Sequence, residues 1–123
     1  QWRSQHTAYR TQTLRFDKAF TWVAFSEALD LLTRLRGADL LRMKGIVNVE
    51  GAPVVVQGVQ HLIQPPVTLD HWPSDDRQSR IVFITRGIEY SALVNVFSAI
   101  DLLMSPAPDA SAQKTSDFVK EAT

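Results

Sequence analysis

The sequence contains no cysteine. It therefore has no disulfide bond, no thiolate metal site and no cysteine nucleophile, which is compatible with a reducing compartment. No apolar run approaches the ~18 residues that would predict a membrane-spanning helix. No charged segment followed by an apolar one marks a signal peptide. We therefore expect a cytoplasmic protein that does not have a membrane as its partner.

Excess charge of one sign is also missing, because 13 basic residues balance 13 acidic ones. A neutral chain has no long-range field that gathers a phosphate backbone, so we expect no nucleic-acid partner. The length of 123 residues is enough for one domain and too short for two ordinary ones. The apolar fraction of 45% is that of an ordinary globular domain.

The motifs of nucleotide binding and hydrolysis are absent as well. The sequence has no GxxxxGK or GxGxxG phosphate loop, no HExxH zinc motif and no GxSxG nucleophile elbow. His71 lies in a loop near three aspartates, Asp70, Asp75 and Asp76. A His/Asp metal site there is an alternative to an ordinary solvated loop, but its spacing is not diagnostic. The residues alone thus indicate a soluble α+β domain for binding or regulation.

The most informative stretch is residues 40–60, LLRMKGIVNVEGAPVVVQGVQ. It begins as the tail of a helical pattern that ends at Gly45. Residues 46–50 then have the composition of a strand. Residues 50–53, EGAP, have the composition of a turn. Residues 54–60 form a second strand, and the short connection predicts an antiparallel hairpin.

Two cations, Arg42 and Lys44, precede this hairpin. Residues two apart in an extended segment share a face, so both side chains should point the same way beside Gly45, where the backbone is open to close approach. The simpler interpretation of the same pattern is a solvated charged pair at the entrance of a strand.

Two helices are expected. Residues 21–36 form the first, with Thr21 as its N-cap and Gly37 as its C′ residue. Its apolar stripe consists of Phe25, Leu29, Leu32 and Leu35. Residues 89–104 form the second helix, with an apolar stripe made by Leu93, Val96, Phe97, Ile100 and Leu103.

The alternation of apolar and polar residues predicts the other strands. Residues 11–17 predict a half-buried strand with one wet face. Residues 61–63 can continue the strand 54–60. Residues 80–86, RIVFITR, are apolar on both faces and predict a central strand, or a sheet that is covered on both sides. Residues 69–78 predict a polar loop in which Trp72 covers the edge of the core.

The order of elements predicts an α+β two-layer sandwich. Its sheet is mostly antiparallel, with about four strands, and two helices lie on one face. Residues 1–10 are expected to be an N-terminal arm or linker, and residues 11–104 the domain. Residues 105–123 are expected to be a disordered tail.

The order of several short motifs resembles the C-terminal domain of the CobW family. These are LLRMKGI at residues 40–46, QGVQ at residues 57–60, Trp72, and RIVFI at residues 80–84. The resemblance covers roughly residues 14–103. The residues that represent it as a structural motif are Leu41, Gln57, Gly58, Trp72 and Phe83. The sequence departs from the family where Phe-Ile-Gly is usual, since it has FITRG at residues 83–87.

In that family the domain follows a P-loop GTPase domain in GTP-dependent metallochaperones, including those linked to cobalamin synthesis and zinc homeostasis. The resemblance implies that GTP, Mg²⁺ and a transition metal belong to the GTPase domain. No residue of those sites exists in this sequence, so we expect neither catalytic residues nor metal ligands nor a cofactor in this chain.

Two hypotheses follow. In the first, the chain is a non-catalytic interaction domain that contacts its own GTPase domain and a metal-dependent client protein. In the second, it is a free-standing small-molecule-binding or catalytic α+β domain. Because two helices can cover only one face of the sheet, the first hypothesis places partner contacts on the other face. The expected contact residues are Arg42, Lys44, Gly45, Val55 and Val59. A second copy of the chain is a further candidate partner, and a loop at residues 69–78 that folds over this face is the alternative.

Overall fold

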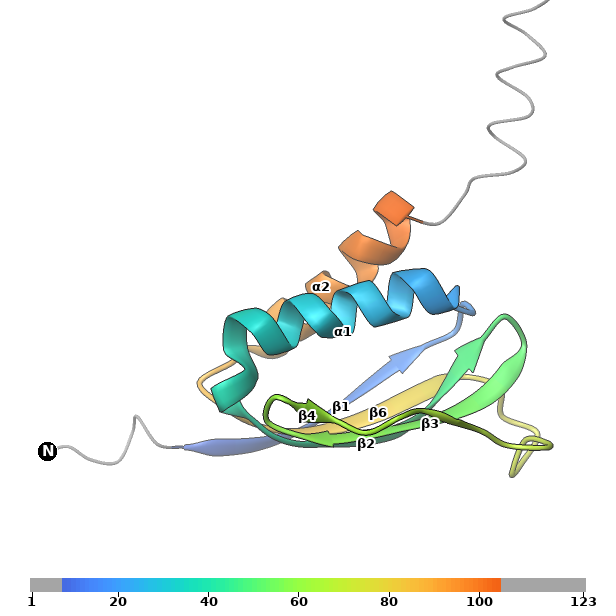
Figure 1. The fold of residues 1–123 in the computed structure, drawn as a ribbon, viewed down its shortest axis with the longest axis horizontal. Coiled ribbons are helices and arrows are strands. Elements are labelled where there is room, and N and C mark those ends of the chain that lie inside the picture. The colour runs from blue at the N-terminus through green and yellow to red at the C-terminus, as the bar shows by residue number, and fades with distance from the viewer. Residues whose placement is uncertain (1–7, 105–123) are drawn as a thin grey trace, which may run out of the picture.

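The structure is a computed structural model that describes residues 8–104. These residues form two layers, a β-sheet and a pair of helices over one of its faces (Figure 1). The α+β two-layer fold class expected from the sequence is therefore confirmed. The predicted tail, residues 105–123, and most of the predicted arm, residues 1–10, lie outside the described residues.

The described sheet has six strands, whereas the sequence predicts about four. Its order is β1-β6-β2-β3, and two short strands, β4 and β5, pair with the far edge of β3. These pairings are all antiparallel. β6 lies between β1 and β2, which confirms the predicted central strand. The strands span Tyr9–Phe16 (β1), Leu40–Val49 (β2), Ala52–Val59 (β3), Leu62–Ile63 (β4), Val67–Thr68 (β5) and Ser79–Arg86 (β6).

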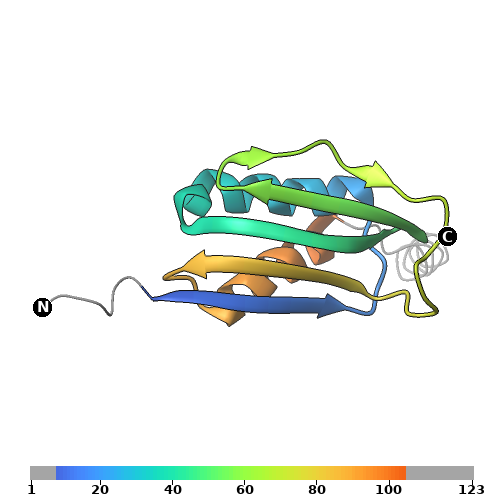
Figure 2. The same cartoon turned by 90° about the horizontal axis from the view of Figure 1, so that it is seen from below.

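The helices α1, Trp22–Arg36, and α2, Tyr90–Met104, lie side by side on one face of this sheet (Figure 1). Thr21 caps α1 as predicted, since its Oγ1 accepts a hydrogen bond of 3.1 Å from the backbone N of Ala24. Seen from the other side, the long strands have no helix in front of them (Figure 2).

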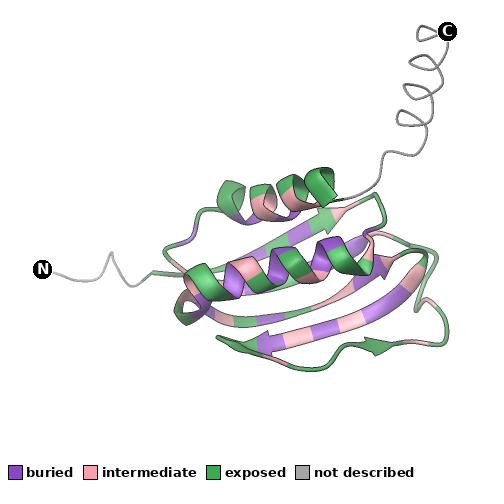
Figure 3. Cartoon of the chain, turned by 45° about the horizontal axis from the view of Figure 1, so that its top comes forward, coloured by how far each residue is buried: buried purple, intermediate pink, exposed green. Residues whose placement is uncertain are grey.

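The apolar stripes of both helices are narrower than predicted. Leu35 and Leu103 are 67% and 79% exposed, so their assignment to the stripes is wrong. Ala24 and Ala28 are buried instead, and their small side chains let α1 lie close to the sheet. Buried (purple) and half-buried (pink) segments alternate with exposed (green) ones along α1 in Figure 3.

Phenylalanine rings join the two layers. Phe97 of α2 stacks on Phe25 of α1 at a centroid distance of 5.5 Å and lies 6.2 Å from Phe83 of β6. All three rings are fully buried. Aromatic pairs at these distances add to the free energy gained by burial. The core therefore depends on contacts between residues that are far apart in the sequence.

The connection from α1 to β2 differs from the prediction. The helical pattern ends at Arg36 instead of Gly45, and a short 3₁₀ turn, η2 (Gly37–Asp39), leads directly into β2. Gly37 has φ of −54°, so it is not a left-handed C′ residue. Its lack of a side chain makes room for His61, because a Cβ at Gly37 would lie 2.4 Å from the His61 ring.

The hairpin between β2 and β3 is confirmed, with a tighter turn than predicted. Glu50 and Gly51 have φ of 53° and 94°, as a two-residue turn with two left-handed positions requires. Pro53 consequently belongs to β3 and lies opposite Asn48.

A second reversal follows at Gln60, whose φ is 54°. The chain turns back here, so the predicted continuation of the strand through residues 61–63 is wrong. Instead Ile63 pairs with Gly58 of β3. A Cβ at Gly58 would lie 2.5 Å from the Ile63 Cδ1, so glycine permits this close pairing.

Candidate functional site

The candidate site is the face of the sheet that carries no helix, which we call the open face. Alternate residues of β6 divide between the two faces. Ile81 and Phe83 are fully buried beneath the helices, whereas Val82 is 36% exposed on the opposite side. The neighbouring strand β2 brings Arg42 and Lys44 to the same face, beside Ile84 and Val82.

Most of the predicted contact residues lie on this face. Arg42 and Lys44 are both exposed and point the same way, as their spacing predicts. Val55 of β3 is half-buried, and Val59 is 51% exposed. Gly45 has a packing role in addition to the contact role predicted for it. A Cβ there would lie 2.3 Å from the backbone O of Arg80, so this glycine lets β2 and β6 approach each other.

The residues of the predicted structural motif have separate roles. Phe83 is fully buried in the core, and Gly58 permits the pairing of β3 with β4. Leu41 lies at an irregularity in the register between β2 and β6. Gln57 lies opposite Lys44 on the open face. Only Phe83 and Gly58 are thus explained by packing.

A groove of about 520 Å³ runs along the open face between these strands and the loop of residues 69–78. Lys44, Val82 and Ile84 line it from the sheet, and Trp72 and Asp76 line it from the loop. The loop therefore forms one wall of the groove and leaves the side chains of Arg42 and Val82 accessible to solvent.

The wall is fixed to the β2–β3 turn by hydrogen bonds. The Trp72 Nε1 donates to the carbonyl of Gly51 over 3.1 Å. The Asn48 Nδ2 donates to the carbonyl of Arg77 over 3.0 Å, and the Asn48 Oδ1 accepts from the N of Gly51. The guanidinium of Arg77 lies 5.4 Å from the centre of the Trp72 ring. Trp72 was expected to cover the edge of the core, but it is half-buried and forms the wall of the groove.

The basic side chains within residues 8–104 divide by location. Some form ion pairs with carboxylates, namely Arg10, Lys18, Arg34, Arg36 and Arg86. Arg77 lies over Trp72. The others form no ion pair with a described residue, and all of them lie on the open face: Arg15, Arg42, Lys44 and Arg80. The unpaired positive charge of the described chain is therefore concentrated on one surface.

The strand register places two of these cations against each other. Arg15 of β1 is directly opposite Arg80 of β6. Like charges at directly opposed positions of an antiparallel pair are destabilising. Neither residue was predicted from the sequence as a contact residue. The alternation of residues 80–86 assigns Arg80 to the face of Val82, but only the register brings Arg15 beside it.

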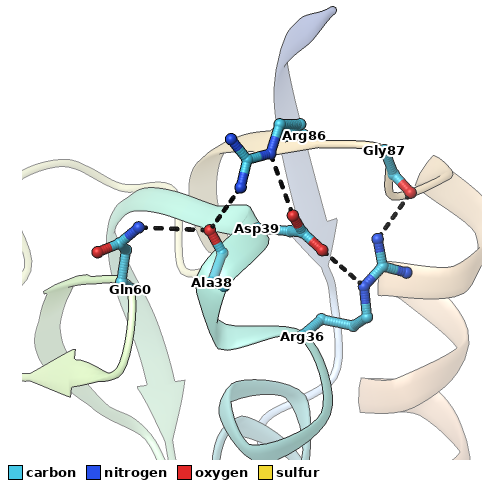
Figure 4. Close-up of polar contacts among 6 residues, drawn as sticks. All are labelled: Arg36, Ala38, Asp39, Gln60, Arg86 and Gly87. Atoms are coloured by element: carbon cyan, nitrogen blue, oxygen red, sulfur yellow. Dashed lines mark hydrogen bonds and ion pairs between the residues drawn. The ribbon is translucent and has the colours of Figure 1, made fainter. Parts of the chain in front are cut away.

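A second cluster of charges lies at the end of the sheet near Gly87 (Figure 4). Asp39 accepts hydrogen bonds from the Nε of Arg36 at 3.0 Å and from the Nε of Arg86 at 3.2 Å. The Arg36 Nη2 donates to the carbonyl of Gly87 over 2.8 Å. The hydrogen bond from Arg36, assisted by that from Arg86, lowers the pKa of Asp39. This cluster connects the end of α1 to the end of β6 and is structural.

Within residues 8–104, no three His, Asp or Glu side chains gather where they could hold a metal ion. His71 and Asp70 line a second depression that is also bordered by Trp72. His61 packs over Gly37. Neither helix in this part of the chain is long and apolar enough to cross a membrane.

The fold and the open face define an α+β domain with one covered and one accessible side. The profile of the "Cobalamin synthesis protein cobW C-terminal domain" matches residues 9–100, so the chain belongs to the CobW C-terminal domain family. The resemblance predicted from the sequence is confirmed. Comparison with curated protein sequences gave no match.

Two solved structures have a similar fold. The Zn(II)-bound YjiA GTPase from E. coli superposes with a TM-score of 0.67 at 21% identity. The match covers 75% of this chain and 29% of YjiA. A Zn(II)-bound triple mutant of YjiA GTPase gives the same TM-score, identity and coverage. This chain therefore corresponds to less than a third of the length of either protein.

Proposed function

We propose that this chain is the non-catalytic interaction domain of a CobW-like, GTP-dependent metallochaperone. Its open face contacts the GTPase domain of the same protein and a metal-dependent client protein. In this proposal GTP, Mg²⁺ and the transported metal bind to the GTPase domain, and this domain transmits the nucleotide state to the client. Membership of the CobW C-terminal domain family supports the connection to a GTPase.

One observation carries the proposal: a sheet with accessible apolar side chains and unpaired cations on the face opposite its helices. Val82 and Val59 are 36% and 51% exposed there. Apolar surface of this kind is characteristic of contact sites when it is bordered by polar residues. The surrounding cations favour a partner with complementary charge and select its orientation.

The proposal is tested by reversing charges on the open face of the protein together with its GTPase domain. Arg42→Glu with Lys44→Glu is the test variant. Lys18→Glu with Arg34→Glu is the matched control, because it makes the same change in net charge at exposed positions outside the open face. We expect the test variant to weaken association with the GTPase domain by at least ~10-fold and the control to leave it unchanged.

Both variants should keep the circular dichroism spectrum of the native chain, because all four side chains are exposed. The control should lower the melting temperature slightly, because it replaces the ion pairs of Lys18 with Asp101 and of Arg34 with Asp30 by like charges. Undiminished association and undiminished GTP-dependent client binding by the folded Arg42→Glu, Lys44→Glu protein would refute the proposal.

A second function is favoured by the size of the groove. Its volume of about 520 Å³ is within the range of ~300–1,000 Å³ typical of small-molecule sites. A free-standing ligand-binding domain predicts stabilisation by a small anionic metabolite in a thermal-shift screen. An increase in melting temperature that Lys44→Glu abolishes, in a chain that binds no GTPase domain, would favour this alternative.

A further inference from the structure

The groove on the open face has a fixed pattern of charge and apolar surface along the strands. Arg42 and Lys44 lie two residues apart on β2, beside Ile84 and Val82. Arg80 lies opposite Ile46, two residues further along. At about 3.3 Å per residue, the cations thus span about 13 Å along the strand direction, with Val82 between the ends.

The carboxylates of the groove do not neutralise these cations. Asp76 is the one acidic residue among those that line it. Its Oδ1 already accepts a hydrogen bond of 2.9 Å from the backbone N of Gln78. Arg42, Lys44 and Arg80 form no ion pair within residues 8–104. The groove consequently offers several donors to an anion from outside the described chain.

Hydrogen bonds within the described chain hold the wall of the groove in a fixed position. Trp72 and the carbonyl of Arg77 are both hydrogen-bonded to the β2–β3 turn or its adjoining strand. A pre-organised wall reduces the entropy lost when a ligand binds. The Arg77 guanidinium lies over one face of the Trp72 ring, and Trp72 is the one aromatic residue among those that line the groove, whereas single-strand binders stack successive bases on several aromatic side chains. This arrangement favours a peptide over a single-stranded nucleic acid.

We propose that the groove binds an extended acidic peptide segment of a partner protein. Two carboxylates four residues apart in that segment contact Arg42 at one end and Arg80 at the other, and Lys44, which lies midway between these two levels, adds positive charge that attracts both. An apolar side chain midway between them packs on Val82 and Ile84. In an extended chain these three side chains lie on the same side and span about 13 Å, which matches the groove. This inference rests on the proposed function and specifies the chemistry of the partner.

The test uses a fluorescein-labelled peptide with the core Glu-Ser-Phe-Ser-Glu and the full chain. Two matched peptides replace both Glu by Lys, or Phe by Ser. We expect the first peptide to bind with a Kd of roughly 10–100 µM by fluorescence anisotropy, and each matched peptide at least ~10-fold more weakly. Arg42→Glu with Lys44→Glu should weaken binding at least ~10-fold, and Arg80→Gln about 3-fold or more. The control Lys18→Glu with Arg34→Glu should bind like the native chain.

Equal binding of the acidic and basic peptides, or equal binding by native and Arg42→Glu, Lys44→Glu chains, overturns the proposal. A short oligothymidylate that binds more tightly than the peptide also overturns it and makes the partner a nucleic acid. If the peptide fails but the same variant still loses the GTPase domain, the peptide inference fails alone. If the peptide binds as expected but the variant keeps the GTPase domain, the proposed function fails alone.

Discussion

The two faces of this sheet differ in how far their side chains are buried and how far their charges are paired. On the covered face, residues such as Ile81 and Phe83 are fully buried against α1 and α2. On the open face, the alternate residues of the same strand, Arg80 and Val82, are exposed to solvent. Arg80 forms no ion pair within residues 8–104, and Val82 leaves apolar surface accessible. One strand thus serves folding on one side and is available for binding on the other.

The difference between the two faces predicts that Phe97→Ala causes the largest loss of stability. Phe97 is fully buried and packs on both Phe25 and Phe83. Its truncation should lower the free energy of unfolding by about 3–5 kcal/mol, measured by urea denaturation. Val82→Ala on the open face is the control, and we expect less than about 1 kcal/mol there. Similar losses for the two variants would contradict the division between the faces.

The second prediction concerns the glycines. Gly45→Ala should cost about 1–3 kcal/mol, because its Cβ would lie 2.3 Å from the backbone O of Arg80 and the central strands must separate. Gly37→Ala should cost less, since its nearest neighbour at 2.4 Å is the His61 side chain, which can rotate away. Urea denaturation of both variants measures the two losses, and we expect the lower midpoint for Gly45→Ala. A larger loss of stability for Gly37→Ala would show that the spacing between β2 and β6 does not require a glycine at position 45.

The sequence predicted this fold wherever a local signal existed. Thr21 marked the start of α1, and the alternation in residues 80–86 identified the central strand. The reversal at Gln60 was missed because a left-handed glutamine is not a typical turn residue. Leu35 fits the helical period but is 67% exposed in the last turn of α1, and the period alone does not show which positions of a stripe are covered.

The site, too, was predictable only where the signal lies in neighbouring residues of the sequence. The spacing of Arg42 and Lys44 gave their common face, since period-two alternation is local. Arg15 and Arg80 become neighbours only through the β1–β6 register, which joins residues more than sixty positions apart. Trp72 was recognised as important, but its role as a wall depends on a hydrogen bond to Gly51 across the hairpin.

The third prediction concerns Asp39, the carboxylate that pairs with Arg86 of β6. Asp39 holds both Arg36 and Arg86, and these contacts lower its pKa. A pKa lowered by folding stabilises the folded state above the unfolded pKa of ~3.9, and this contribution is lost as pH falls through the folded value. Asp39→Asn should therefore cost up to about 1 kcal/mol at neutral pH. The difference between the two urea midpoints should shrink below pH ~4. A constant difference at all pH values would rule out the charge as its cause.

The smallest effect, and the one most specific to the open face, is expected from Arg15→Glu. Arg15 lies directly opposite Arg80, so the substitution replaces a repulsive cross-strand pair by an attractive one. We expect the free energy of unfolding to increase by about 0.2–1 kcal/mol, in contrast to most substitutions, which destabilise. Arg15→Gln is the control, because it removes the repulsion without adding an attraction, and it should give a smaller increase. The gain should decrease when the urea series is repeated in 1 M salt, where the Debye length is only about 3 Å. A lower midpoint for Arg15→Glu would mean that the open face gains stability from its own cations, and that their concentration on this face does not reflect a surface reserved for a partner.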